Sequence, residues 1–140
     1  MPAPLVPDAQ LRVVGLTPTP QRRAVLALLI GRSRPLTAQE VHAELNHSVQ
    51  HIGLTTVYRA LHNLADAGLL HTFELDGQRA YRHCDTAPHQ HLICTRCDTV
   101  TECPPDIVTS WLTELHQHTG FTPRPDRLDV KGICAACAST

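Results

Sequence analysis

The chain has 140 residues, a formal net charge of −1 at pH 7, six Cys and ten His, and only 4% aromatic residues. This length can bury one core or two small ones, and no apolar run approaches the roughly 20 residues that a membrane-spanning helix needs. The N-terminus lacks the pattern of a signal peptide, so we expect a cytoplasmic protein whose cysteines are ligands rather than disulfides.

Charge is divided unevenly along the chain. Residues 1–83 carry eight Lys/Arg against six Asp/Glu, whereas residues 84–140 carry four against seven. The first part is therefore weakly basic. This balance is compatible with a nucleic-acid partner, although many DNA-binding domains are far more basic.

Helices dominate the first part of the sequence. A loose arm over 1–9 precedes a short helix over 11–16. Thr19 and Pro20 then predict the N-cap and first residue of a helix over 20–31, with Arg22 in its first turn facing solvent or phosphate. Thr37 and Glu40 form a capping box that opens a helix over 37–46.

The next helix, predicted over 55–67 and ended by Gly68, has the pattern of a DNA-reading helix. Its apolar residues recur at a spacing of three to four and face the core. Its first turns expose polar side chains that suit the recognition helix of a helix-turn-helix, namely Thr55, Thr56, Tyr58 and Arg59.

A hairpin follows, with strands over 69–75 and 78–83 joined at Asp76-Gly77. Three helices and a two-stranded ribbon describe a winged helix, so we predict a DNA-binding domain over residues 1–84 whose Arg79 or Arg82 touches phosphate. Residues 85–90 are the predicted hinge.

Residues 91–140 are predicted to form a small α/β domain for dimerisation and metal binding, which makes the fold class α+β. A strand, a turn at Asp98 and a second strand occupy 91–103, a helix runs from 104 to 119, and a last strand lies within 121–133. The helix has an apolar stripe that we expect to be buried, made of Ile107, Val108, Trp111, Leu112 and Leu115. Because this half is too small to cover its apolar face alone, a homodimer is expected.

Two Cys-x-x-Cys pairs with 36 residues between them predict a tetrahedral zinc site made of Cys94, Cys97, Cys134 and Cys137. Such a site stabilises the fold rather than regulating it. A redox role would need one such motif and leaves the second unexplained.

A second metal site is predicted from four other residues. His89 and His91 point to one face of an extended segment. In the hairpin register set by the two-residue turn, His71 lies opposite Arg82, and Cys84 is diagonal to His71 on the same face. A thiolate with imidazoles favours zinc over manganese, with iron(II) less suited. Scattered surface histidines are the competing interpretation, and His83 is a reserve ligand.

Four stretches together resemble the ferric uptake regulator family, a family of metal-dependent bacterial transcriptional regulators that are usually dimeric repressors. They are LTPTPQRRAVLAL (16–28), TTVYRALHNL (55–64), AGLL (67–70), and HQHLICTRC (89–97) with the final Cys pair. The resemblance implies that the four paired cysteines hold structural zinc, that His89 and His91 belong to a regulatory site, and that Tyr58 and Arg59 read bases. Cys84 and His71 match the zinc-sensing branch.

Three departures from the family pattern carry information. Arg82 lies near the position where the iron-sensing branch has Glu. Pro88 and Gln90 replace ligands of a further metal site, which we predict to be missing. Thr17 lies where a basic residue often enters the minor groove, and Arg12 is the candidate substitute.

The sequence therefore predicts a homodimeric, zinc-responsive repressor that binds a palindromic DNA operator, with one structural and one regulatory zinc per protomer and no enzymatic activity. Within the family, the alternatives are an iron or manganese sensor and a peroxide sensor. A remote alternative is a zinc hydrolase using Cys84, His89 and His91.

Overall fold

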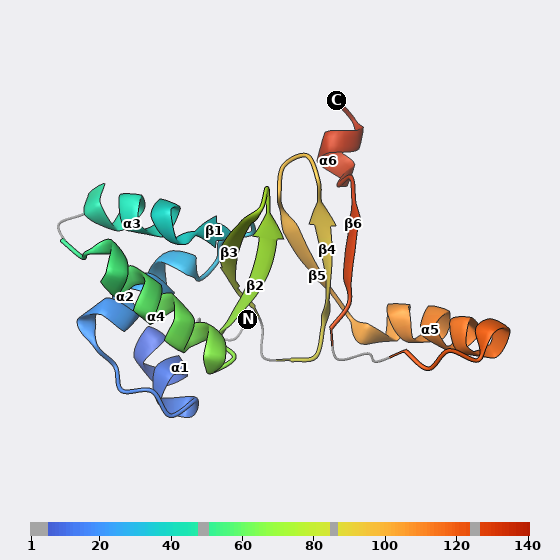
Figure 1. The fold of residues 1–140 in the computed structure, drawn as a ribbon, viewed down its shortest axis with the longest axis horizontal. Coiled ribbons are helices and arrows are strands. Elements are labelled where there is room, and N and C mark those ends of the chain that lie inside the picture. The colour runs from blue at the N-terminus through green and yellow to red at the C-terminus, as the bar shows by residue number, and fades with distance from the viewer. Residues whose placement is uncertain (1–5, 48–50, 85–86, 124–126) are drawn as a thin grey trace. The chain divides into compact units, whose positions relative to one another are not determined.

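The computed structural model describes residues 6–47, 51–84, 87–123 and 127–140. The chain divides into two compact units, Met1–Cys84 and Asp85–Thr140 (Figure 1). Within the described ranges, no helix has both the length and the apolarity needed to span a bilayer. The α+β fold class is as predicted.

The first unit contains four helices, α1 (Pro7–Val13), α2 (Pro20–Leu29), α3 (Ala38–His47) and α4 (Leu54–Asp66). The predicted caps are present. The Thr19 hydroxyl accepts the Arg22 N–H at 3.2 Å. Thr37 accepts the Glu40 N–H at 3.2 Å, and Glu40 accepts the Thr37 N–H at 3.1 Å, which is the reciprocal pattern of a capping box.

The first two helices have bounds that differ from the prediction by more than one residue. The first helix begins at Pro7 rather than residue 11, because proline suits the first helical position and the Asp8 carboxylate accepts a 2.6 Å hydrogen bond from Arg23 of α2. The predicted arm is therefore wrong from Pro7 onward, and its residues 1–5 lie outside the described residues. The second helix ends at Leu29, and Gly31 then takes a left-handed φ of +83°.

Three strands complete the first unit: β1 (Leu36–Thr37), β2 (Leu70–Leu75) and β3 (Gln78–His83), in the order β1-β3-β2. The hairpin has the predicted register, with His71 opposite Arg82. Both turn residues have positive φ, 50° at Asp76 and 76° at Gly77, as a tight two-residue hairpin turn requires. Strand β1 was not predicted, because a two-residue strand leaves no alternating pattern to detect.

The core of the first unit is built by α1–α4 with the sheet. Fifteen buried residues form one cluster, to which α2 contributes Val25, Leu26 and Leu29. The periodic residues of α4, Val57, Leu61 and Leu64, are fully buried in it. The opposite side of α4 stays open to solvent or a partner.

The second unit contains β4 (Gln90–Cys94), β5 (Val100–Cys103), α5 (Pro105–Thr119), β6 (Asp129–Gly132) and α6 (Ala135–Ala138). Its sheet has the order β5-β4-β6, with β5 antiparallel and β6 parallel to β4. Asp98 turns the β4–β5 connection with φ +60°, and Gly120 ends α5 with φ +71°. Of the predicted hinge, residues 85–86 lie outside the described residues, and Gln90 is already part of β4.

The apolar stripe of α5 is a correction to the prediction. Of its five residues only Val108 is buried, whereas Ile107 is 70% and Trp111 54% exposed. In Figure 1, α5 runs away from the three strands of its own unit. The described part of the second unit therefore leaves this stripe uncovered.

Candidate metal centres

Four cysteine sulfurs converge at one end of the second unit's sheet. Cys94 ends β4 and Cys97 lies in the turn after it. Cys134 is the N-cap of α6, and Cys137 lies within that helix. All four sulfurs lie within 4.8 Å of one another, and Cys97 Sγ is 3.8 Å from Cys134 Sγ. Tetrahedral zinc with bonds of about 2.3 Å separates its sulfurs by about 3.8 Å. This four-cysteine cluster therefore fits zinc.

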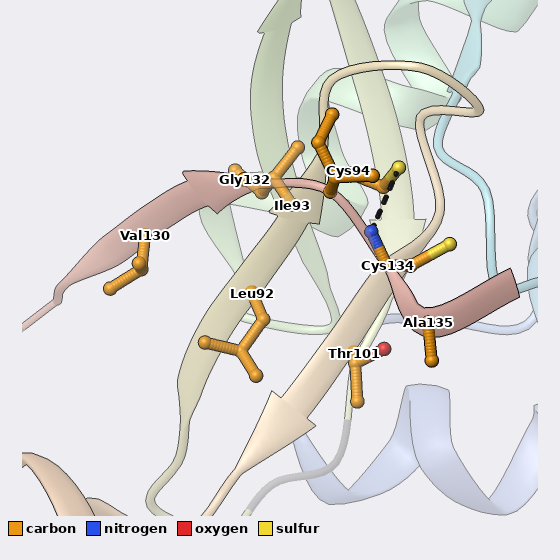
Figure 2. Close-up of a pocket in the computed structure, with 9 residues that line it drawn as sticks. Leu92, Ile93, Cys94, Thr101, Val130, Gly132, Cys134 and Ala135 are labelled. Atoms are coloured by element: carbon orange, nitrogen blue, oxygen red, sulfur yellow. Dashed lines mark hydrogen bonds between the residues drawn. The ribbon is translucent and has the colours of Figure 1, made fainter. Parts of the chain in front are cut away.

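Backbone hydrogen bonds hold the four-cysteine cluster in shape. Cys94 N–H donates to Thr99 O at 3.0 Å and Asp98 N–H to Cys94 O at 2.9 Å, which closes the turn that carries Cys97. The second Cys pair is attached to the first, because Cys134 N–H points at Cys94 Sγ from 3.4 Å (Figure 2). Both pairs are thus positioned by main chain rather than by flexible side chains.

The electrostatics of the cluster favour a bound cation. The N–H that Cys134 donates lowers the pKa of Cys94 to about 6, and the Thr99 hydroxyl and N–H lower the pKa of Cys97. The neighbouring Cys134 and Cys97 thiols instead raise the pKa of Cys137 to about 12. Four thiolates this close repel one another, and a dication removes that repulsion.

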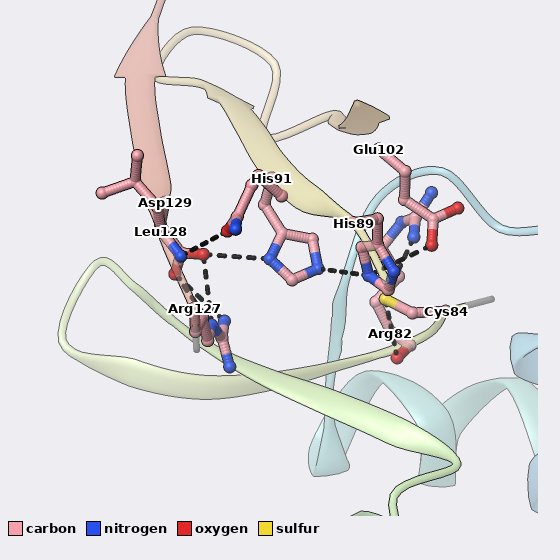
Figure 3. Close-up of polar contacts among 9 residues, drawn as sticks. Arg82, Cys84, His89, His91, Glu102, Arg127, Leu128 and Asp129 are labelled. Atoms are coloured by element: carbon pink, nitrogen blue, oxygen red, sulfur yellow. Dashed lines mark hydrogen bonds and ion pairs between the residues drawn. The ribbon is translucent and has the colours of Figure 1, made fainter. Parts of the chain in front are cut away.

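Two imidazoles meet at the other end of β4. His91 lies in β4 and His89 precedes that strand, and their Nε2 atoms are 3.1 Å apart. His89 Nδ1 is 2.7 Å from Ala87 O. His91 Nδ1 is 2.9 Å from Asp129 Oδ1 (Figure 3). Burial lowers the pKa of His91 against the opposing effect of Asp129. A neutral imidazole is the form that binds metal.

One residue beside this histidine pair was not predicted from the sequence. Glu102 Oε1 lies 3.3 Å from His89 Nε2, and Glu102 pairs directly with His91 across β4 and β5. The pairing of Ile93 with Val100 sets this register, and the position of Asp98 alone does not specify it. An additional oxygen ligand is therefore available beside the two nitrogens.

Gln90 makes a structural contact within the second unit. Its side chain is buried, and its Oε1 accepts the Leu128 N–H at 2.5 Å. The residue thereby ties β4 to the segment that leads into β6. This contact gives Gln90 a role that does not involve metal.

His71 and Cys84 form a second pair, within the first unit. His71 is half-buried on β2, Cys84 is buried just after β3, and their ligand atoms lie within 4.8 Å of each other. Of the two predicted phosphate contacts, Arg82 is only 9% exposed, which leaves the exposed Arg79 as the candidate. Arg82 donates to Cys84 Sγ and to Ser33 O, both at 3.2 Å. The reserve ligand His83 places Nε2 2.8 Å from Gln10 Oε1.

The predicted DNA-contacting residues are exposed or half-buried in the first unit. Thr55, Tyr58 and Arg59 are exposed on α4, and Thr56 is half-buried. A groove of about 640 Å³ separates α4 from the hairpin, lined by Tyr58, Arg59, His62, Asn63, Glu74, Gly77, Arg79 and Tyr81. Arg12 is exposed at the end of α1, and Arg22 donates to Thr17 O at 2.8 Å.

A helical unit with a winged sheet, joined to a small α/β unit carrying a four-cysteine cluster and a histidine pair, defines a class of metal-binding winged-helix proteins. The model of the ferric uptake regulator family matches residues 13–131. The chain belongs to the ferric uptake regulator family, and is thus a metal-responsive transcriptional regulator and not an enzyme. Membership excludes the hydrolase alternative.

Individual relatives sharpen this picture. A zinc uptake regulation protein of Mycobacterium tuberculosis is 35% identical over 130 residues, covering 92% of this chain and all of that protein. A structure described as a zinc uptake regulator complexed with zinc and DNA is 27% identical with a TM-score of 0.67, covering 94% of this chain and 90% of that one. A ferric uptake regulator from Pseudomonas aeruginosa with manganese is 26% identical with a TM-score of 0.68, covering 94% and 99%.

Proposed function

We propose that this protein is a zinc-responsive repressor, which binds a palindromic DNA operator as a homodimer when its regulatory site holds zinc. The observation that carries the proposal is the ligand chemistry of Cys84. This thiol lies beside His71 in the first unit, and under the proposal it would add a soft ligand to the imidazoles of the second. Thiolate with imidazole suits zinc, whereas manganese prefers oxygen-rich sites. The zinc uptake regulators among the relatives support the same choice.

In this proposal one regulatory zinc is shared by the two units. His71 and Cys84 belong to a DNA-binding domain over residues 1–84, and His89 and His91 lie across the hinge at 85–90. Each pair is formed within its own unit, so the ion has only to bring two prepared pairs together. Zinc would then restrict the DNA-binding domain relative to the dimerisation domain over residues 91–140 and select the arrangement that fits an operator.

A second zinc per protomer would occupy the four-cysteine cluster and stabilise the fold. The four sulfurs already lie at the spacing of a tetrahedral zinc site. Zinc supplies a charge that the thiolates need and links the end of β4 to α6. This ion would stay bound while the regulatory ion exchanges.

The proposals for dimerisation and for DNA contact rest on side chains that are exposed on α5 and α4. The uncovered stripe of α5, with Ile107 and Trp111 exposed, is an apolar surface that a second copy would bury. Two copies would present two α4 helices, whose Tyr58 and Arg59 would meet base edges in successive major grooves. The palindromic form of the operator follows from this two-fold symmetry.

One observation favours a second candidate, an iron or manganese sensor. The Glu102 carboxylate lies 3.3 Å from His89 Nε2. With two imidazoles it makes a nitrogen and oxygen set that also suits harder divalent ions. The choice between the candidates depends on whether Cys84 or Glu102 is the ligand that decides affinity.

DNA-binding titrations with buffered metals test the proposal. Protein that retains only its tightly bound zinc is mixed with labelled DNA from upstream of its own gene, and fluorescence anisotropy is followed against free zinc, iron(II) and manganese(II). We expect zinc to induce binding at the lowest free concentration. Equal induction by iron or manganese without any response to zinc would support the second candidate.

Cysteine variants assign the response to its site. Cys84→Ala should abolish metal-dependent DNA binding while one zinc per protomer remains. Cys103→Ala is the matched control, because Cys103 lies in β5 and belongs to neither candidate metal site. This variant should respond to metal like the wild type. A Cys84→Ala protein that unfolds or loses all zinc would contradict the division into regulatory and structural sites.

A further inference from the structure

In the second unit, the carboxylate of Asp129 lies beside the histidine pair, and strand pairing sets its position. Asp129 is the first residue of β6 and pairs in register with His91 across the parallel β4–β6 contact. Its Oδ1 lies 2.9 Å from His91 Nδ1, and the His91 side chain is only 1% exposed. The imidazole is therefore enclosed and held from the side opposite its other nitrogen.

The carboxylate dictates which nitrogen of His91 carries the proton. An ionised carboxylate only accepts hydrogen bonds, so His91 Nδ1 must be the N–H that donates to it. In the neutral ring, the lone pair then lies on Nε2. That atom is the one that faces His89 Nε2 at 3.1 Å. Asp129 thus leaves His91 Nε2 ready to bind an ion.

His89 provides an internal comparison. Its Nδ1 lies 2.7 Å from the backbone oxygen of Ala87, a neutral acceptor. The two imidazoles therefore direct their Nε2 atoms to the same place, and His91 has a carboxylate at its Nδ1 where His89 has a carbonyl. A carboxylate behind a ligand imidazole makes its metal-binding nitrogen more basic.

Arg127 holds the carboxylate in place. Its Nε lies 3.1 Å from Asp129 Oδ1 and 3.2 Å from Oδ2, and its Nη2 lies 3.0 Å from Oδ2. Burial disfavours the anion, but the hydrogen bonds from Arg127 and His91 outweigh burial and lower the pKa of Asp129. The residue thus stays ionised and oriented at neutral pH.

We propose that Asp129 is a positioning residue for the regulatory metal, acting through His91 by fixing its tautomer and orientation. The role rests on the proposed function, because His91 must be a regulatory ligand for it to matter. Asp129 itself does not touch the ion. It determines how well one of the ligands is prepared before the ion arrives.

Two variants separate positioning from a structural role. Asp129→Ala removes the acceptor, whereas Asp129→Asn keeps the shape and one carbonyl acceptor but removes the charge. Asp106→Asn is the control, because Asp106 is an exposed carboxylate in the first turn of α5. Zinc affinity at the regulatory site is measured by competition with a chelator, on protein that keeps the zinc of its four-cysteine cluster. The His91 tautomer is read from ¹⁵N chemical shifts, assigned by comparison with His91→Gln.

We expect Asp129→Ala to weaken zinc binding at the regulatory site by about 10–100-fold, as loss of such outer partners typically does, and to release the Nδ1–H tautomer. Asp129→Asn should fall between this variant and the wild type, and Asp106→Asn should match the wild type. A wild-type affinity in Asp129→Ala, or an unchanged tautomer, would overturn the role. So would the loss of zinc from the four-cysteine cluster in Asp129→Asn, because that loss would make the residue structural.

The same data distinguish this inference from the proposed function. If wild-type DNA binding ignores zinc while Asp129→Ala still alters the tautomer and the zinc affinity, the proposed function fails, whereas the effect of Asp129 on His91 and on its metal remains. If zinc controls DNA binding and both Asp129 variants bind zinc as the wild type does, the positioning role fails alone.

Discussion

Removing one ligand of the four-cysteine cluster should unfold the second unit and leave the first folded. Cys137→Ala takes away one of four thiolates, and zinc then loses the tetrahedral set on which its affinity depends. Besides the cluster ligand Cys94, the described residues of the second unit bury only three apolar side chains, namely Ile93, Val100 and Val108. The first unit has a cluster of fifteen buried residues of its own. The two units should therefore respond differently.

The free-energy contributions of apolar burial and of zinc binding show why folding of the second unit depends on the metal. Burying an apolar side chain contributes about 1.5–3 kcal/mol, so the three that are not zinc ligands contribute on the order of 4.5–9 kcal/mol. A structural zinc site contributes about 10–16 kcal/mol in small metal-binding domains. The ion thus contributes more to stability than the buried apolar side chains of this unit.

Hydrogen exchange read by mass spectrometry provides the assay. In Cys137→Ala, the amides of β4, β5 and β6 should exchange at unfolded rates, while those of β2, β3 and α4 stay protected. Trp111, the single tryptophan, gives an independent signal from α5 in the second unit. Cys103→Ala should behave as the wild type. Retained protection of β4–β6 in a zinc-free Cys137→Ala protein would refute the reasoning.

Three further predictions concern the first unit. Arg59→Ala should weaken specific DNA binding by about 1–3 kcal/mol if it reads a base edge, whereas equal losses on specific and random DNA in anisotropy titrations would make it a phosphate contact. Leu26→Ala should lower the free energy of unfolding by about 2–5 kcal/mol in urea, because this side chain is fully buried; a smaller loss would indicate that the site collapses. Burial opposes ionisation of Glu40, but hydrogen bonds from Arg34 and Thr37 outweigh it and lower its pKa. Its stabilisation is therefore present above the unfolded pKa near 4.5 and is lost as pH falls through the lower folded value. In thermal melts, Glu40→Gln should be less stable than the wild type near neutral pH, and this difference should shrink below about pH 4.5. A difference that does not change with pH would contradict this cause.

Local chemistry in the sequence was enough to predict most elements. The Thr37–Glu40 capping box, the Asp76-Gly77 turn and Gly120 each specify a backbone conformation without help from distant residues. The hairpin register followed from the length of its turn, and this correctly placed His71 opposite Arg82. Two Cys pairs at ligand spacing likewise predicted the four-cysteine cluster.

What the sequence could not reveal depends on contacts between distant segments. Asp129 meets His91 only because β6 lies parallel to β4, and no local pattern encodes that pairing. Arg82 was interpreted as a phosphate contact because arginine is usually solvated. The structure instead gives it hydrogen bonds to Ser33 O and Cys84 Sγ, and the first of these partners is remote in sequence. The stripe of α5 was expected to be buried because periodicity identifies an apolar face but not what covers it.

The β4–β6 strand pair has a consequence for the order in which ions are acquired. Strand β4 carries His91 near one end and Cys94 at the other, while β6 begins at Asp129 and leads directly into Cys134. An ion at the cysteines would therefore hold together the strands that prepare the histidine. Under the proposed function, a newly made chain must first bind the structural zinc ion, which does not regulate DNA binding. At free zinc concentrations too low to fill the four-cysteine cluster, the protein would not fold and could not respond to zinc. The range of zinc concentrations that it senses would therefore begin above the concentration that its folding requires.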